Sequence, residues 1–86
     1  MKGLLNKIKN RNTRQRFVVS TIRREDGLFE TAVFATSLWY FPKSLANPEM
    51  TVRTRSKDEA WDMHYRLTER LTTEFPARVF QEFSQN

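Results

Sequence analysis

The stretch RFVVSTIRREDGLFETAVFAT, residues 16–36, decides the fold. Two runs rich in Phe, Val, Ile and Thr flank Asp26-Gly27, a dipeptide typical of a two-residue β-hairpin turn. With this turn as the loop, Arg23 faces Glu30 and Thr21 faces Ala32, and opposite charges across paired strands are favourable. Both hairpin faces are partly apolar. We therefore expect one face to pack under a helix and the other to be covered by a partner or by the C-terminal segment.

The region after the hairpin predicts more strand and a loop. Residues 37–41, Ser-Leu-Trp-Tyr-Phe, extend the strand pattern or begin a third strand. Pro42 and Pro48 bracket a loop. Residues 50–55 alternate, which indicates a half-exposed strand. One face carries Met50, Val52 and Thr54, and the other carries Thr51, Arg53 and Arg55.

A capping box predicts the main helix. Ser56 and Glu59 have the spacing of such a box: the Ser56 side chain can accept a hydrogen bond from the backbone N–H of Glu59, and the Glu59 side chain can reach back to Ser56. The helix should run from Lys57 to about Glu74. Its apolar stripe consists of Ala60, His64, Leu67 and Leu71, with Phe75 as a candidate fifth member and Trp61 and Met63 flanking it. Pro76 ends or kinks this helix, and residues 77–83 favour a short second helix over a final strand.

The basic residues are concentrated at the N-terminus. Residues 1–24 contain eight Lys and Arg and no Asp or Glu, whereas the remaining 62 residues contain seven basic and ten acidic residues. We expect residues 1–15 to form a flexible or short-helical basic arm, with Leu4, Leu5 and Ile8 on one side of any helical turn. Residues 16–86 then form one α+β domain, in which a β-hairpin and a further strand, three to four strands in all, pack on one C-terminal helix.

The composition argues against catalysis. The chain has no Cys, one His and two Gly residues, so Cys-His pairs, His-metal clusters and Gly-rich phosphate loops are not expected. We therefore predict no enzymatic activity, no cofactor and no metal. His64 is interpreted as a core histidine bonded to a backbone carbonyl in preference to a pH sensor or a general base. No apolar run has the length of a membrane span, and the N-terminus does not have the pattern of a secretory signal.

The basic segment favours a polyanionic partner. The candidate contacts are Lys7, Lys9, Arg11, Arg14 and Arg16, extended by Arg53 and Arg55. Nucleic acid or a nucleoprotein complex is the leading partner. An anionic membrane surface, a specific protein contact and a merely solvated tail are the alternatives. The aromatic residues Trp39, Tyr40 and Phe41 could stack on bases, fill the core or form a protein interface.

Short motifs also resemble a family of small phage-encoded proteins. They are VSTI at 19–22, GLFETAVF at 27–34 and RSKDEA at 55–60 followed by His64. The resemblance covers residues 18–67, and Met63 stands where typical members have Gly. It implies a phage genome, a host cytoplasm and an accessory or host-modulating role. No catalytic or binding residue is implied by it.

Three functions follow from these observations. The first is a non-enzymatic accessory protein that contacts nucleic acid through its basic arm. The second is an accessory protein that binds and modulates or inhibits a host protein, and the third is a virion component. Whether a homo-oligomer closes the uncovered hairpin face is left open.

Overall fold

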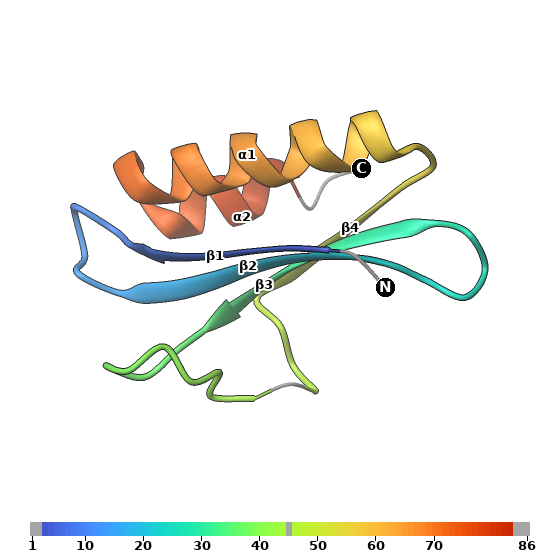
Figure 1. The fold of residues 1–86 in the computed structure, drawn as a ribbon. Coiled ribbons are helices and arrows are strands. Elements are labelled where there is room, and N and C mark those ends of the chain that lie inside the picture. Colours follow the sequence, from blue (N-terminus) through green and yellow to red (C-terminus); the bar gives the residue numbers. More distant parts are fainter. Residues whose placement is uncertain (1–2, 45, 84–86) are drawn as a thin grey trace.

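Four antiparallel strands pair in sequence order, and two helices cover one side of the sheet (Figure 1). The computed structural model describes residues 3–44 and 46–83. The strands are β1 (Leu4–Lys9), β2 (Arg16–Arg23), β3 (Phe29–Ala35) and β4 (Met50–Thr54). The helices are α1 (Lys57–Thr73) and α2 (Pro76–Phe83). The predicted α+β class is confirmed, as are the strand after residue 50 and both helices.

The predicted arm is wrong for residues 4–9, which form the edge strand β1. Leu4 to Lys9 pair antiparallel with Thr21 to Arg16. Ile8 is buried against Phe17, its partner in this register. The spacing of Leu4, Leu5 and Ile8 matched a helical turn, but a neighbouring strand with unpaired backbone groups supplies hydrogen bonds that a short isolated helix lacks.

The hairpin is confirmed, with a register one residue away from the predicted one. Thr21 pairs with Thr31, and Ile22 pairs with Glu30. The loop has three residues, because the Gly27 N–H donates to the carbonyl of Arg24 and Arg24 N–H donates to the carbonyl of Leu28. Within this loop Gly27 alone has a positive φ, of 88°. This is the pattern of a type I turn closed by a left-handed glycine. The partner of Glu30 is therefore Arg24, at 3.1 Å, and not Arg23.

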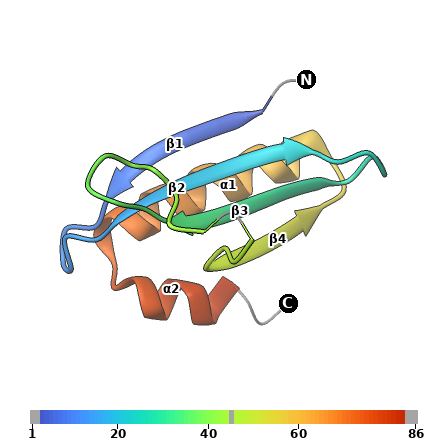
Figure 2. The same ribbon diagram turned by 90° about the horizontal axis from the view of Figure 1, so that it is seen from below.

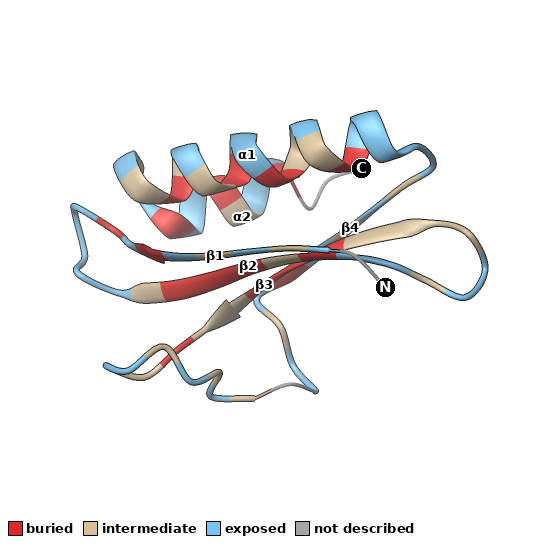
Figure 3. Cartoon of the chain, in the orientation of Figure 1, coloured by how far each residue is buried: buried red, intermediate tan, exposed pale blue. Residues whose placement is uncertain are grey.

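Helix α1 lies across the sheet and buries the predicted stripe (Figure 3). Ala60, His64, Leu67 and Leu71 are all buried, whereas Phe75 follows the end of α1, is 60% exposed and does not belong to the stripe. The Ser56 hydroxyl accepts from the Glu59 N–H at 3.1 Å, and the Glu59 carboxylate accepts from the same hydroxyl at 3.0 Å. The capping box is thus present, with the return bond made through the hydroxyl. Helix α2 adds Val79 and Phe83 to the core.

The opposite side of the sheet is called the open face here. It carries the residues that alternate with the core residues, and the β3–β4 connection of residues 36–49 lies below it (Figures 1 and 2). On this face Val18 and Ala32 are buried, whereas Leu5 is 61% exposed. Connections as long as this one are uncommon in small domains and usually have a function.

Candidate binding surface

Three cationic side chains lie together on the open face. Phe17 packs against Phe80 of α2 on the helix side, so its strand neighbour Arg16 lies on the opposite face. Ile8 pairs with Phe17 and is in the core, which places Lys7 and Lys9 on the open face as well. Lys9 and Arg16 are direct partners across the two strands. The group Lys7, Lys9 and Arg16 is called the cationic strip.

Two more cations extend the strip into the β1–β2 loop. Arg11 and Arg14 are exposed in this loop, and Arg14 has a positive φ of 65°. Together with Lys9 and Asn10 they line a shallow hollow of about 270 Å³, which no acidic residue lines. Within residues 3–44 and 46–83, neither the cationic strip nor Arg11 or Arg14 forms an ion pair. Their charge is therefore available to an external anion.

The predicted extension through Arg53 and Arg55 is different. Arg53 lies on the open face of β4 opposite Glu30, and its Nε is 3.4 Å from a Glu30 carboxylate oxygen. The same oxygen accepts from Arg24 at 3.1 Å. Arg55 is exposed beyond the end of β4. This side of the sheet is partly neutralised, so the free positive charge is concentrated at β1 and the start of β2.

The charge of the molecule is divided between its two layers. Residues 3–55, which form the sheet and its connections, contain ten basic and four acidic residues. Residues 57–83, which form the helical layer, contain four basic and six acidic residues. A field with this polarity orients the open face towards a polyanion.

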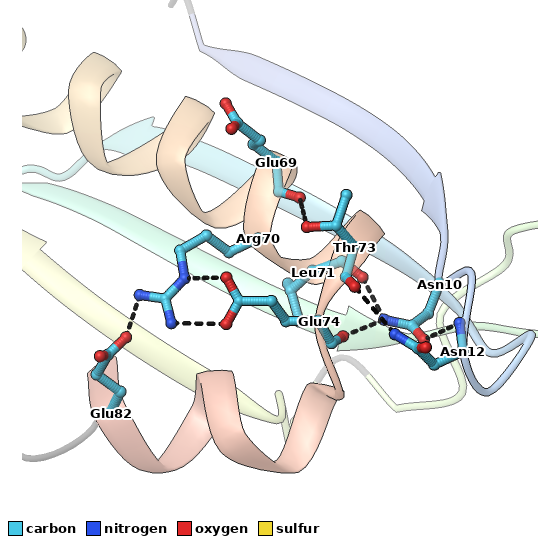
Figure 4. A network of polar contacts seen from close by, with 8 residues as sticks. All are labelled: Asn10, Asn12, Glu69, Arg70, Leu71, Thr73, Glu74 and Glu82. Atoms are coloured by element: carbon cyan, nitrogen blue, oxygen red, sulfur yellow. Dashed lines mark hydrogen bonds and ion pairs between the residues drawn. The ribbon is translucent and has the colours of Figure 1, made fainter.

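The β1–β2 loop is fixed to the end of α1 by Asn10 (Figure 4). The Asn10 amide nitrogen donates to the carbonyls of Leu71 and Glu74 at 2.5 and 2.6 Å. Its amide oxygen accepts from the N–H groups of Asn12 and Thr13, both at 2.9 Å. The last turn of a helix leaves carbonyls without partners, and this loop satisfies them. It therefore holds the basic side chains on a rigid support.

The same turn receives two further hydrogen bonds from this loop. The Arg11 N–H donates to the Thr72 carbonyl at 2.9 Å, and the Asn12 side chain donates to the Thr73 carbonyl at 3.0 Å. Nothing in the sequence pattern marks this connection, because it joins residues about 61 positions apart.

Residues 37–41 form a projecting turn, which corrects the expectation that they extend the strand pattern or begin a third strand. The Tyr40 N–H donates to the Ser37 carbonyl, and the Ser37 N–H donates to the Phe41 carbonyl, both at 3.0 Å. A bridge between Thr36 and Pro42 closes its base. Residues 36–42 are called the finger. Tyr40 has a positive φ of 63°, which no sequence pattern here predicts.

The side chains at the tip of the finger are exposed. Trp39 is 75% exposed, Phe41 is 71% exposed and Leu38 is 60% exposed. Tyr40 instead turns back to the sheet, where the Arg16 guanidinium lies 5.8 Å from the centre of its ring. Arg16 thereby connects the finger to the cationic strip. Leu38, which no sequence pattern singles out, belongs to the same exposed group.

His64 is buried in a polar network between α1 and the sheet. Its Nδ1 is 2.8 Å from the Thr21 hydroxyl, which is 2.7 Å from the Thr31 hydroxyl, and its Nε2 is 2.7 Å from the Asn6 amide oxygen. These contacts fit a neutral ring that donates to Asn6 and accepts from Thr21. Burial lowers the pKa of His64 below its ordinary value. The expected backbone carbonyl partner is thus wrong, while the core position is confirmed.

A second charged cluster joins the two helices (Figure 4). The Arg70 guanidinium makes two hydrogen bonds to Glu74, at 2.8 and 2.9 Å, and another to Glu82. It also lies over the Phe83 ring. The hydrogen bonds from Arg70 lower the pKa of the Glu74 carboxyl. Every charge here has a partner, so the cluster is a contact between helices and offers little to a ligand.

Comparisons with known proteins give no further guidance. No protein-family model, curated protein or solved structure matches the chain. Over the described ranges, no group of three or more His, Asp or Glu residues is placed to hold a metal ion. Neither α1 nor α2 is long and apolar enough to cross a membrane. The candidate site therefore consists of the cationic strip, the β1–β2 loop and the finger.

Proposed function

We propose that this protein binds nucleic acid through the cationic strip and the β1–β2 loop. The observation that carries the proposal is that Lys7, Lys9 and Arg16 share one end of the open face, that Arg11 and Arg14 follow in the adjoining β1–β2 loop, and that none of the five has an ion-pair partner among the described residues. Lys and Arg side chains neutralise backbone phosphates and release the condensed counterions.

The arrangement suits a linear polyanion. Lys7 and Lys9 lie two residues apart on one strand, roughly 7 Å along its axis. Arg16 lies beside Lys9 on the next strand, and Arg11 and Arg14 continue past its end. The support is rigid, because the loop backbone and Asn10 are bonded to α1. Less conformational freedom is therefore lost when the cations contact phosphates.

Salt dependence tests this proposal. If the five cations each contact one phosphate, affinity should fall roughly 100- to 500-fold between 50 and 200 mM monovalent salt. The variant K7Q/K9Q/R16Q should lower the slope of log affinity against log salt by about 2 to 3. The matched control K57Q/R66Q/R78Q removes the same charge from the helical layer and should keep the slope. No binding at 50 mM salt, or an equal loss in the control, would refute the proposal.

A protein partner is the second candidate, and the finger is the observation that favours it. Exposed Trp and Phe side chains are frequent anchors of protein interfaces, and Leu38 adds aliphatic surface beside them. A nuclease-treated lysate of the natural host should then contain one protein that the wild type retains and a W39A/F41A variant does not. Retention that depends on intact nucleic acid would instead support the first candidate.

A further inference from the structure

The finger presents more apolar surface than its own fold requires. Trp39 and Phe41 leave about three quarters of their side chains exposed, although both sit on a turn closed by hydrogen bonds. The Ser37 hydroxyl also accepts from the N–H groups of Trp39 and Phe41, at 3.3 and 3.4 Å. The turn therefore holds these rings outward, where they are accessible to a ligand.

The position of the finger indicates which ligand. In Figure 2, which views the molecule from below, the β3–β4 connection passes in front of the end of β1 and the start of β2, where Lys9 and Arg16 are partners. The contact between Arg16 and the Tyr40 ring joins the two surfaces, and Lys43 follows the finger directly, with its N–H bonded to the Ala35 carbonyl. Exposed aromatic rings thus border a row of unpaired cations.

We propose that the finger is a stacking platform for unpaired bases of a single-stranded nucleic acid whose phosphates lie on the cationic strip. This inference rests on the proposed function and adds the substrate class to it. Aromatic side chains beside a basic groove are the usual means of holding single strands, because every base has a π-face that a ring can cover. In a duplex those faces are covered by neighbouring base pairs.

The alternatives fit the surface less well. An anionic membrane also attracts aromatic and cationic side chains, but it would favour cations around the tip of the finger. Here Lys43 is the one cation that directly follows the finger, whereas the five unpaired cations run along β1 and β2 and into the β1–β2 loop. A purely apolar protein partner has no use for five unpaired cations beside its anchor. A single strand uses both features.

The test compares single-stranded and duplex DNA of equal length, with W39A and F41A as variants. Loss of a stacked base typically lowers affinity about 5- to 150-fold. Each variant should weaken binding of a fluorescently labelled (dT)20 by a factor in this range, with an unchanged salt slope, and should affect a duplex much less. The controls Y65A and F75A remove exposed aromatics from the helical side, where Tyr65 is 51% and Phe75 is 60% exposed, and they should bind like the wild type.

Intrinsic fluorescence gives a second readout. Trp61 is half-buried and packs edge-on against Phe29 at 6.0 Å, so quenching by (dT)20 that is present in the wild type and absent in W39F belongs to Trp39. Because Trp39 is exposed, these variants should keep the wild-type circular dichroism spectrum, which makes loss of binding interpretable.

Different outcomes refute the stacking of bases on the finger and the binding of nucleic acid itself. If K7Q/K9Q/R16Q weakens binding while W39A and F41A bind (dT)20 like the wild type, the stacking inference is overturned and the proposed function stands. If W39A reduces binding to phosphatidylserine vesicles or to a host protein but not to (dT)20, the finger belongs to a membrane or protein contact and the inference is also overturned. If the wild type binds no nucleic acid at 50 mM salt, both are refuted.

Discussion

Asn10 should be one of the most sensitive positions in the chain. Its buried side chain makes two hydrogen bonds to the last turn of α1 and accepts two from its own loop. At about 1 kcal/mol for each bond, with some recovery where water reaches the loop, Asn10→Ala should cost about 3–4 kcal/mol. A domain of this size has only about 4–13 kcal/mol in total. Urea unfolding followed by circular dichroism measures the difference.

Two further variants make this prediction specific. Asn12→Ala removes one exposed hydrogen bond to Thr73 and should cost about 0.5–1 kcal/mol. Asn10→Asp keeps the acceptor but loses the donor and brings negative charge to the carbonyl end of α1, which is unfavourable. The pKa of the new carboxyl should rise in the folded state. The penalty is therefore full above that pKa and disappears as the pH falls below the ordinary Asp value of about 3.9. An Asn10→Ala variant within about 1 kcal/mol of the wild type would refute the capping role.

Three other changes have defined outcomes. Burial lowers the pKa of His64, so the unfolded chain takes up a proton on His64 before the folded protein does as the pH falls. The free energy of unfolding should therefore fall as the pH drops below about 6.5, by up to about 1.4 kcal/mol per pH unit. His64→Gln should flatten this dependence in urea titrations at several pH values. Ser56→Ala should lower the free energy of unfolding by about 1 kcal/mol, and an unchanged urea midpoint would contradict the observed cap. Glu30→Gln removes the partner of Arg53 and one of the two carboxylates that contact Arg24, the other being Asp26. It should tighten nucleic-acid binding at low salt while changing stability by less than about 1 kcal/mol, and weaker binding in the titration would contradict the electrostatic argument.

Strand β1 was not predicted, because a buried polar residue interrupts the alternation of apolar and polar residues that identifies a strand. In β1 the core-facing positions are Leu4, Asn6 and Ile8. Asn6 interrupts the apolar alternation that identifies a strand, and it is tolerated because His64 is its partner. That partner lies 58 residues away, so no local pattern shows that the position is inside.

The hairpin register failed for a related reason. Asp26-Gly27 is compatible with a two-residue turn and with a three-residue loop, and these differ by one position in the pairing. A shift of one residue reverses which side chains of the two strands share a face. The expected pair of Arg23 with Glu30 did not distinguish the two registers, because the neighbouring Arg24 pairs with Glu30 in the observed one. The helices were predictable because Ser56, Glu59 and the apolar stripe are local signals that agree with one another.

The candidate site was predictable in its residues and not in its geometry. Lys7, Lys9 and Arg16 were named from charge alone, but only the pairing of β1 with β2 places Lys9 beside Arg16. The left-handed backbone of Tyr40, which turns residues 36–42 outward, depends on contacts with Ser37 and Arg16. The sequence shows which residues are charged, but only the fold shows which of these side chains lie close together.

The long reach of the bonds from Asn6 and Asn10 has a consequence for how the chain is made. Strand β1 leaves the ribosome before its helical partners at residues 64–74, which are among the last of the described residues to emerge. Contacts between such distant positions slow folding, because a long loop must close before any bond rewards it. Until then β1 has β2 as its only partner, and its outer edge is open to other chains. Expression at a low level should therefore favour soluble protein, because few chains with this open edge are then present together.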